Sequence, residues 1–188
     1  MTFPSHDLET APEGSKALLE NSQKAFGRLP GLHKVLAESP QAFEGYQLLH
    51  KLFTETDFDA EELTVVWQTI NVEHECHYCV PAHTGIAKMM KVSDEITDAL
   101  RNETPLPTGK LEALRTFTLQ VVRTRGNVSK AQIDAFFAAG YGHRAVLDVV
   151  LGLAQKTMSN YINHMAETPV DEVFHSLLWE RRGAPLEV

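Results

Sequence analysis

The two cysteines of the chain, Cys76 and Cys79, both lie in the stretch VEHECHYCVPAHTGIAKMM, and His83 follows Cys79 by four residues. Two sulfurs at this CxxC spacing can close a disulfide with little movement of the backbone. On a helix that begins near Cys76, an imidazole four residues after a thiol can reach it. The thiolate is the reactive form of cysteine, and a neighbouring histidine or a helix N-terminus favours it. The stretch therefore predicts a redox-active dithiol in which His83 assists Cys79.

Other kinds of site need residues that this stretch does not fully supply. A c-type haem anchor requires a histidine directly after the second cysteine, and Val80 stands there. A structural zinc site usually takes its ligands from two separated pairs, and the chain has no second CxxC. His83 would be a third ligand, and a fourth would have to come from His74, His77 or Glu73. Two inert, buried cysteines are the remaining alternative. We expect no metal and no cofactor.

Length and composition indicate one globular domain, residues 1–188. Hydrophobic residues make up 43% of the chain and charged residues 22%, and the net charge is -8 at pH 7. This charge argues against a nucleic-acid partner and against electrostatic docking on an anionic membrane. No apolar run approaches the ~18–20 residues of a membrane span. The start, MTFPSHDLETAPEGS, lacks the regions of a secretory signal. We expect a cytoplasmic protein, in which paired cysteines are more often catalytic or metal-binding than structural.

The elements that must position the dithiol are predicted to be helices, because apolar residues recur at helical spacing through most of the chain. No stretch alternates like a β-strand. The loop ETPLPTG divides the chain into two helical parts, and two similar halves are possible without a clear sequence repeat. Asn160 and Asn163 are polar in an otherwise apolar segment, where we expect them to hydrogen-bond between helices. The fold class is an all-α bundle, with helices expected over 15–29, 40–56, 59–73, from Pro81, after Ser93, and over 110–126, 129–140, 143–166 and 170–183.

The motif ECHYCVPAHTGIAK resembles the CxxCxxxH active-site signature of the alkylhydroperoxidase D-like (AhpD-like) group in the carboxymuconolactone decarboxylase superfamily. The likeness is specific over the motif. It extends loosely over the helical pattern and over the segment from Asn160 to Asp171. It implies an AhpD-like multi-helix bundle, assembly into a homo-oligomer such as a trimer or hexamer, and activity as a thiol peroxidase.

The resemblance also implies a role for each residue of the motif, which spans 73–83. Cys79 would be the thiolate that attacks the peroxide, Cys76 would resolve the product, and His83 would move protons for Cys79. The best-studied peroxidases of the group carry a histidine directly before the second cysteine, where this chain has Tyr78. The Tyr78 hydroxyl is a candidate for that part of the relay.

The same peroxidases carry a glutamate twelve residues before the first cysteine, and this chain has Thr64 there. Two other carboxylates lie near in sequence. Glu73 stands one helical turn before Cys76, and Glu62 stands two residues before Thr64. We favour Glu73 for the missing carboxylate because of its spacing, with Glu62 as the alternative.

The predicted function is a thiol-dependent peroxidase that reduces a small hydroperoxide through a Cys76/Cys79 dithiol–disulfide cycle. The resemblance suggests a lipoyl or thioredoxin-like dithiol as the reductant. One alternative is a redox-sensing dithiol protein without rapid turnover. Another is a lyase like carboxymuconolactone decarboxylase, whose activity should survive loss of both cysteines.

Overall fold

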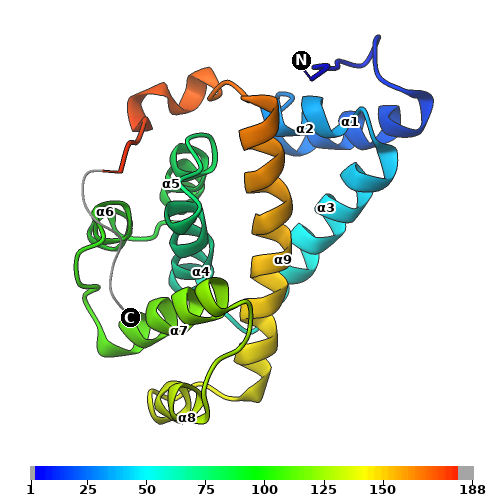
Figure 1. Ribbon diagram of the computed structural model, residues 1–188. Helices are drawn as coiled ribbons and strands as arrows, with labels where there is room; N and C mark the ends of the chain where they lie inside the picture. The colour runs from blue at the N-terminus through cyan, green and yellow to red at the C-terminus, as the bar shows by residue number, and fades with distance from the viewer. Residues whose placement is uncertain (1–2, 182–188) are drawn as a thin grey trace.

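The computed structural model describes residues 3–181, and every regular element in that range is helical, as the sequence predicts (Figure 1). No helix in this range has the length and apolar character needed to cross a bilayer. The elements are α1 (Glu13–Phe26), α2 (Gly31–Leu36), α3 (Pro40–Thr54), α4 (Ala60–Glu73), α5 (Cys79–Met89), α6 (Asp94–Asn102), α7 (Gly109–Thr124), α8 (Lys130–Ala138), α9 (His143–Ala166) and the 3-10 helix η1 (Glu172–Leu177).

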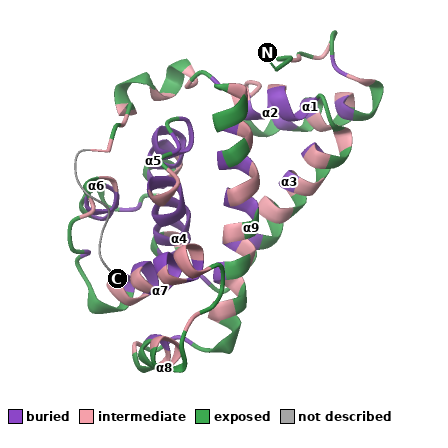
Figure 2. Ribbon diagram, viewed as in Figure 1, coloured by how far each residue is buried: buried purple, intermediate pink, exposed green. Residues whose placement is uncertain are grey.

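Helices α4 and α9 form the centre of the bundle. α9 packs along α3 and α4, and α4 also contacts α5, α6 and α7 (Figure 1). The motif helix α5 packs against α4, α9 and η1. Figure 2 shows α4 and α5 largely buried, whereas α8 and the outer faces of α3 and α9 are exposed. The dithiol helix therefore belongs to the interior of the bundle.

Short polar side chains set the starts of several helices. The side chains of Ser39, Asp59, Ser93, Thr108 and Ser129 each accept a hydrogen bond from a backbone N–H in the first turn of the following helix. Such caps satisfy N–H groups that have no partner inside the helix. Asp59 and Ser129 form complete capping boxes. These signals can be read locally, so most of the predicted helix starts lie close to the observed ones.

Three segments differ from the helices expected. α2 has six residues, which is too short to show a periodic pattern. The segment after α9 forms a 3-10 helix instead of an α-helix, and residues 182–183 of the expected helix lie outside the described range. α5 begins at Cys79 instead of near Cys76, because the chain reverses direction between the two cysteines.

Two clusters of buried apolar side chains make up the core. One includes Phe53, Trp67 and Phe117. The other includes both cysteines, with Leu32 from α2 and Tyr46 from α3. The dithiol is thus packed into a hydrophobic cluster, and any polar group beside it must find its partners within the protein.

Candidate active site

The turn between α4 and α5 brings the two cysteines together. Glu75 adopts a left-handed conformation with φ 52°. The N–H groups of Cys76 and Glu75 donate to the carbonyls of Asn71 and Val72 at 2.9 and 3.0 Å. This is a Schellman cap without its usual glycine. Helix α5 then starts at Cys79, whose N–H donates to Cys76 Sγ at 3.3 Å. A sharp reversal of the chain, and not one continuous helix, gives the CxxC its geometry.

The two thiols are chemically unequal, although both are free and buried. Burial alone would raise the pKa of Cys79. The hydrogen bond from the Cys76 thiol and the charge of Lys156 outweigh burial and hold that pKa well below its usual range. The same hydrogen bond, together with burial, raises the pKa of Cys76 far above its usual range. Asn163 Nδ2 also donates to Cys79 Sγ, at 3.3 Å. The site therefore favours a Cys79 thiolate beside a protonated Cys76.

Lys156, on α9, is the cation of this site, and only 1% of its surface is exposed. Its Nζ donates to His83 Nε2 at 2.9 Å, and its charge acts against burial to lower the pKa of Cys79. Burial lowers the pKa of Lys156, while the negative charge of the Cys79 thiolate acts in the opposite direction. An unpaired ammonium in a protein interior is costly, so Lys156 and the thiolate stabilise each other's charged forms.

His83 lies one helical turn after Cys79 on α5 and hydrogen-bonds Lys156. An ammonium group has only donors, so His83 Nε2 accepts and the ring proton lies on Nδ1. Burial and the Lys156 charge hold the pKa of His83 well below its usual range, so the ring is neutral at pH 7. The ring packs against Trp67, with centroids 4.8 Å apart. Within residues 3–181, His83 Nδ1 is buried without a protein hydrogen-bond partner. The structure thus places His83 in the buried surroundings of the dithiol, with Lys156 as its hydrogen-bond partner.

Buried amide side chains join the three helices that carry these groups. Asn160 Nδ2 donates to Asn71 Oδ1 at 3.0 Å, which links α9 to α4. Asn71 Nδ2 donates to Gln68 Oε1 at 2.9 Å, and Gln68 Nε2 donates to the carbonyl of Val80 in α5 at 3.1 Å. Asn160 and Asn163 therefore bond between helices, as expected. Networks of this kind fix the positions of the groups that they surround.

Tyr78 uses its hydroxyl to hold other parts of the chain against the motif. The hydroxyl donates to Asp171 Oδ2 at 2.9 Å and accepts from the N–H of Leu32 at 3.2 Å. Asp171 also pairs with Arg28 at 2.7 Å and accepts from the N–H of Gly31 at 2.9 Å. The phenol, expected as a candidate relay group, thus ties the motif to α2 and to the segment that leads into η1.

The two carboxylates predicted as relay candidates are each bound to a cation. Glu73 accepts two hydrogen bonds from Arg123, both at 2.7 Å, and Arg181 lies 3.7 Å away. The hydrogen bond with Arg123 lowers the pKa of Glu73. Glu62 pairs with Lys110 at 2.8 Å. The contacts described for residues 3–181 join neither carboxylate to the dithiol, where the charged neighbour is Lys156.

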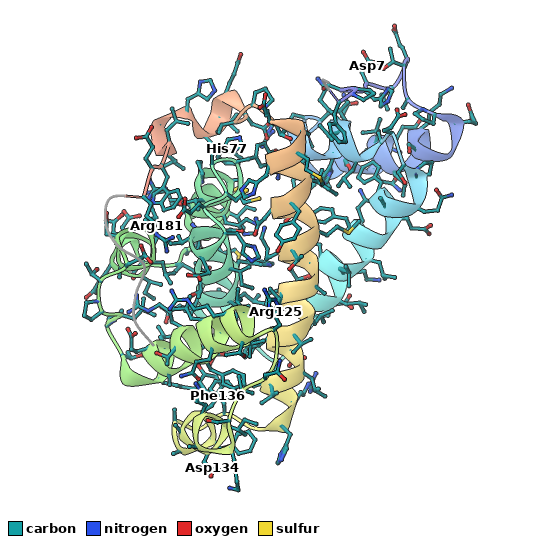
Figure 3. The ribbon with its side chains drawn as sticks, in the orientation of Figure 1. Asp7, His77, Arg125, Asp134, Phe136 and Arg181 are labelled. Atoms are coloured by element: carbon teal, nitrogen blue, oxygen red, sulfur yellow. The ribbon has the colours of Figure 1, made fainter. Side chains whose placement is uncertain are left out.

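The histidines considered as zinc ligands have other partners. His77 Nε2 donates to the carbonyl of Thr168 at 3.0 Å, near the start of α5 (Figure 3). His74 Nδ1 lies 3.0 Å from Asn160 Oδ1. In the described part of the chain, no three His, Cys, Asp or Glu side chains are grouped to hold a metal ion. The geometry around the cysteines therefore suits thiol chemistry better than metal binding.

Replacing Tyr78 with phenylalanine is expected to lower the free energy of unfolding by about 1–3 kcal/mol. The change leaves the N–H of Leu32 and the Asp171 carboxylate without their hydroxyl partner in a largely buried place. Urea unfolding of the reduced protein measures the difference. Tyr161→Phe is the matched control, because Tyr161 is 53% exposed. Equal losses in the two variants would contradict the role assigned to Tyr78.

Lys156 is the residue that the sequence analysis missed. It lies 73 residues from His83, in the segment VVLGLAQKTMSNYINHM. Helical spacing places Lys156 on the same face as Gly152, Asn160 and Asn163, and all four are buried. A lysine on the core-facing side of a largely apolar helix is unusual, and that was the available signal.

No protein-family model and no curated protein matches the sequence. Solved structures match its fold. A peroxidase-related protein with an alkylhydroperoxidase AhpD core, from Ralstonia eutropha JMP134, has a TM-score of 0.80 and 21% identity, with 92% of this chain and 93% of that chain covered. A peroxidase-related protein from Silicibacter sp. TM1040 has a TM-score of 0.78 and 16% identity, with 93% of each chain covered.

A third similar structure is a cysteine-to-alanine variant of the debrominase Bmp8 in complex with 2,3,4-tribromopyrrole. Its TM-score is 0.76 at 14% identity, and 94% of this chain and 95% of that chain are covered. At these identities the likeness describes the arrangement of the helices. The chemistry must be argued from the residues of the site.

Proposed function

The chain has the AhpD-like fold, and from that premise we propose that it is a thiol-dependent peroxidase acting on small hydroperoxides. The observation that carries the proposal is the unequal surroundings of the two buried sulfurs. Cys76 Sγ accepts from the Cys79 N–H at 3.3 Å, and Cys79 Sγ accepts from Asn163 Nδ2 at 3.3 Å. Around Cys79, hydrogen bonds and the Lys156 charge outweigh burial and lower the pKa of that thiol, which supports a reactive thiolate. A thiolate attacks a peroxide, and a second thiol at CxxC spacing resolves the oxidised product.

The proposed cycle has two steps on the protein. The Cys79 thiolate attacks the terminal oxygen of ROOH, the O–O bond breaks, and Cys79 becomes a sulfenic acid while the alkoxide takes up a proton and leaves as ROH. The Cys76 sulfur then attacks the Cys79 sulfur, a disulfide forms, and the sulfenic oxygen leaves as water with the Cys76 proton. An external dithiol reduces the disulfide by exchange and is itself oxidised.

Two further features of the proposal concern partners. A lipoyl or thioredoxin-like dithiol is proposed as the reductant. Assembly into a homo-oligomer is proposed as well, and apolar side chains on the outer face of α9 support it. Large apolar groups exposed together on a helix face are typical of contact surfaces. The exposed residues on this face are Leu147, Val150, Tyr161 and Met165.

The proposal is tested by following the consumption of cumene hydroperoxide by the reduced protein in excess dithiothreitol. We expect the wild type to consume the hydroperoxide continuously and Cys79→Ser to consume none above background. In a separate assay without added thiol, Cys76→Ser should consume at most one equivalent of hydroperoxide. Mass spectrometry should then find a sulfenic acid on Cys79 in the Cys76→Ser variant. Consumption of one equivalent by the wild type, with reductant still present, would favour the redox-sensing alternative.

A second assay uses the likeness to the debrominase. Wild type, Cys79→Ser and Cys76→Ser are incubated with 2,3,4-tribromopyrrole and dithiothreitol, and released bromide is measured. Bromide release without peroxide consumption would show that the dithiol acts on a different substrate class.

The lyase alternative is tested with a lactone substrate. Activity on the lactone that survives in both cysteine variants would favour that alternative.

A further inference from the structure

We propose that Lys156 is a catalytic residue of this site. Lys156 holds Cys79 as a thiolate, and it supplies the proton that the departing alkoxide needs. The first role stands on the buried cluster and does not depend on the peroxidase function. The second rests on the proposed peroxidase function.

Lys156 and Cys79 are both buried in the bundle. Lys156 and Cys79 have 1% and 2% of their surfaces exposed, so water does not screen the charges that they carry. Lys156 Nζ donates to His83 Nε2 at 2.9 Å, and His83 lies one helical turn from Cys79 on α5. Asn163 Nδ2, on the same face of α9 as Lys156, donates to the Cys79 sulfur at 3.3 Å. A cation and a donor amide around one sulfur favour its anionic form. This arrangement takes the place of the Glu73 carboxylate and the Tyr78 hydroxyl, which the motif resemblance made candidates for the relay.

The other ionisable groups around the pair do not supply a competing cation. His50 on α3 and His83 on α5 have pKa values lowered first by burial, and both are therefore neutral at pH 7. Burial likewise lowers the pKa of His74 at the end of α4. Burial raises the pKa values of Tyr46 on α3 and Tyr78 at the turn, so both phenols stay protonated. The remaining neighbour, Cys76, is a protonated thiol. Lys156 is thus the positive charge that faces the sulfur.

The proposed reaction needs a proton donor beside Cys79. Attack by a thiolate on ROOH releases RO⁻ inside a buried site, and a nearby acid must protonate it. Lys156 has three N–H donors, and one of them is directed at His83 Nε2. Burial lowers the pKa of Lys156, which makes its ammonium a better acid than an exposed lysine. Lys156 loses one proton to the alkoxide and regains it when the external dithiol reduces the disulfide.

Two substitutions separate the two roles. Lys156→Met removes the charge and the proton, whereas Lys156→Arg keeps a charge but cannot release a proton at neutral pH. The ultraviolet absorbance of the thiolate is titrated with pH in the Cys76→Ser background, where Cys79 is the only cysteine. We expect Lys156→Met to raise the midpoint by about 1–3 pH units and Lys156→Arg to leave it low. In the otherwise wild-type protein, we expect both to slow peroxide turnover at pH 7 by about 10²–10⁴-fold.

The controls keep failure of this inference distinct from failure of the proposed function. Lys24→Met changes an exposed lysine on α1 and should move neither readout. Thiolate titration needs no peroxide, so it tests Lys156 even if the wild type is not a peroxidase. If folded Lys156→Met leaves the midpoint of the Cys79 thiolate titration unchanged, Lys156 does not hold the thiolate. If Lys156→Arg turns over peroxide at the full rate, Lys156 does not supply the proton. If Lys156→Met does not fold, Lys156→Gln replaces it. A wild-type Cys79 that titrates like an ordinary thiol overturns the inference without any lysine variant.

Discussion

Replacing Cys79 with alanine is expected to lower the free energy of unfolding by about 3–5 kcal/mol at pH 7, because it leaves the Lys156 ammonium buried without its anion. Lys156→Met should also lower the free energy of unfolding, because it leaves the Cys79 thiolate buried without its cation. The double variant Cys79→Ala/Lys156→Met should recover much of the loss, since neither charge then remains. Urea unfolding of the four proteins under reducing conditions gives the coupling energy between the two positions.

The loss in Cys79→Ala should also depend on pH, with a sign that follows from the lysine. Burial makes the pKa of Lys156 lower in the folded chain than in the unfolded chain. Between those two pKa values the unfolded chain binds more protons, so the stability of Cys79→Ala should rise as pH increases through that window. In the wild type less of this rise comes from Lys156, because the thiolate moves the Lys156 pKa back upward. The lowered pKa of Cys79 gives the wild type a separate rise, which ends at the pKa of the unfolded thiol.

Cys76→Ala is the matched control for this experiment. It removes a buried thiol from the same turn without removing an anion, so it should cost less than Cys79→Ala. Adding Lys156→Met to Cys76→Ala should restore none of the lost free energy of unfolding. If the effects of Cys79→Ala and Lys156→Met add within about 0.5 kcal/mol, the two side chains are not coupled and the ion pair assigned here is wrong.

The dithiol and the helical fold could be predicted because their signals are local. Caps such as Asp59 and Ser93 mark helix starts within a few residues of sequence. The CxxC spacing and His83 likewise lie within one short segment. The functions assigned to Cys76, Cys79 and His83 stay predictions, but the structure places all three side chains together in the buried interior.

The partners of the dithiol could not be predicted in the same way. The preference for Glu73 assumed that helical spacing continued to Cys76, but α4 ends at Glu73 and the chain reverses at Glu75. Glu73 therefore lies against Arg123, 50 residues away in sequence. Lys156 comes from a helix that returns to the motif helix α5 only after three intervening elements, and no spacing rule links the two segments. Tertiary packing decides such pairs.

The packing of α9 against its neighbours offers the second test. Gly152 lies one helical turn before Lys156, where α9 passes close to α3 and α4. A Cβ at this position would lie 2.7 Å from Phe53 Cε2 and 2.9 Å from Val66 Cγ1, and both of those side chains are fully buried. Gly152→Ala is expected to cost about 1–3 kcal/mol in stability, even though alanine favours helices. Gly152→Leu should cost more than about 3 kcal/mol and can prevent folding.

Gly45 on α3 provides the matched control, because a Cβ there would meet nothing within 4 Å. Gly45→Ala should therefore stabilise the protein by about 0.5–1 kcal/mol. The two alanine variants are also expected to differ at the site. Pushing α9 away from α4 moves Lys156 away from Cys79, so Gly152→Ala should raise the midpoint of the Cys79 thiolate titration, and Gly45→Ala should not. A destabilised Gly152→Ala protein with an unmoved midpoint would show that the cation beside Cys79 does not depend on the close approach of α9.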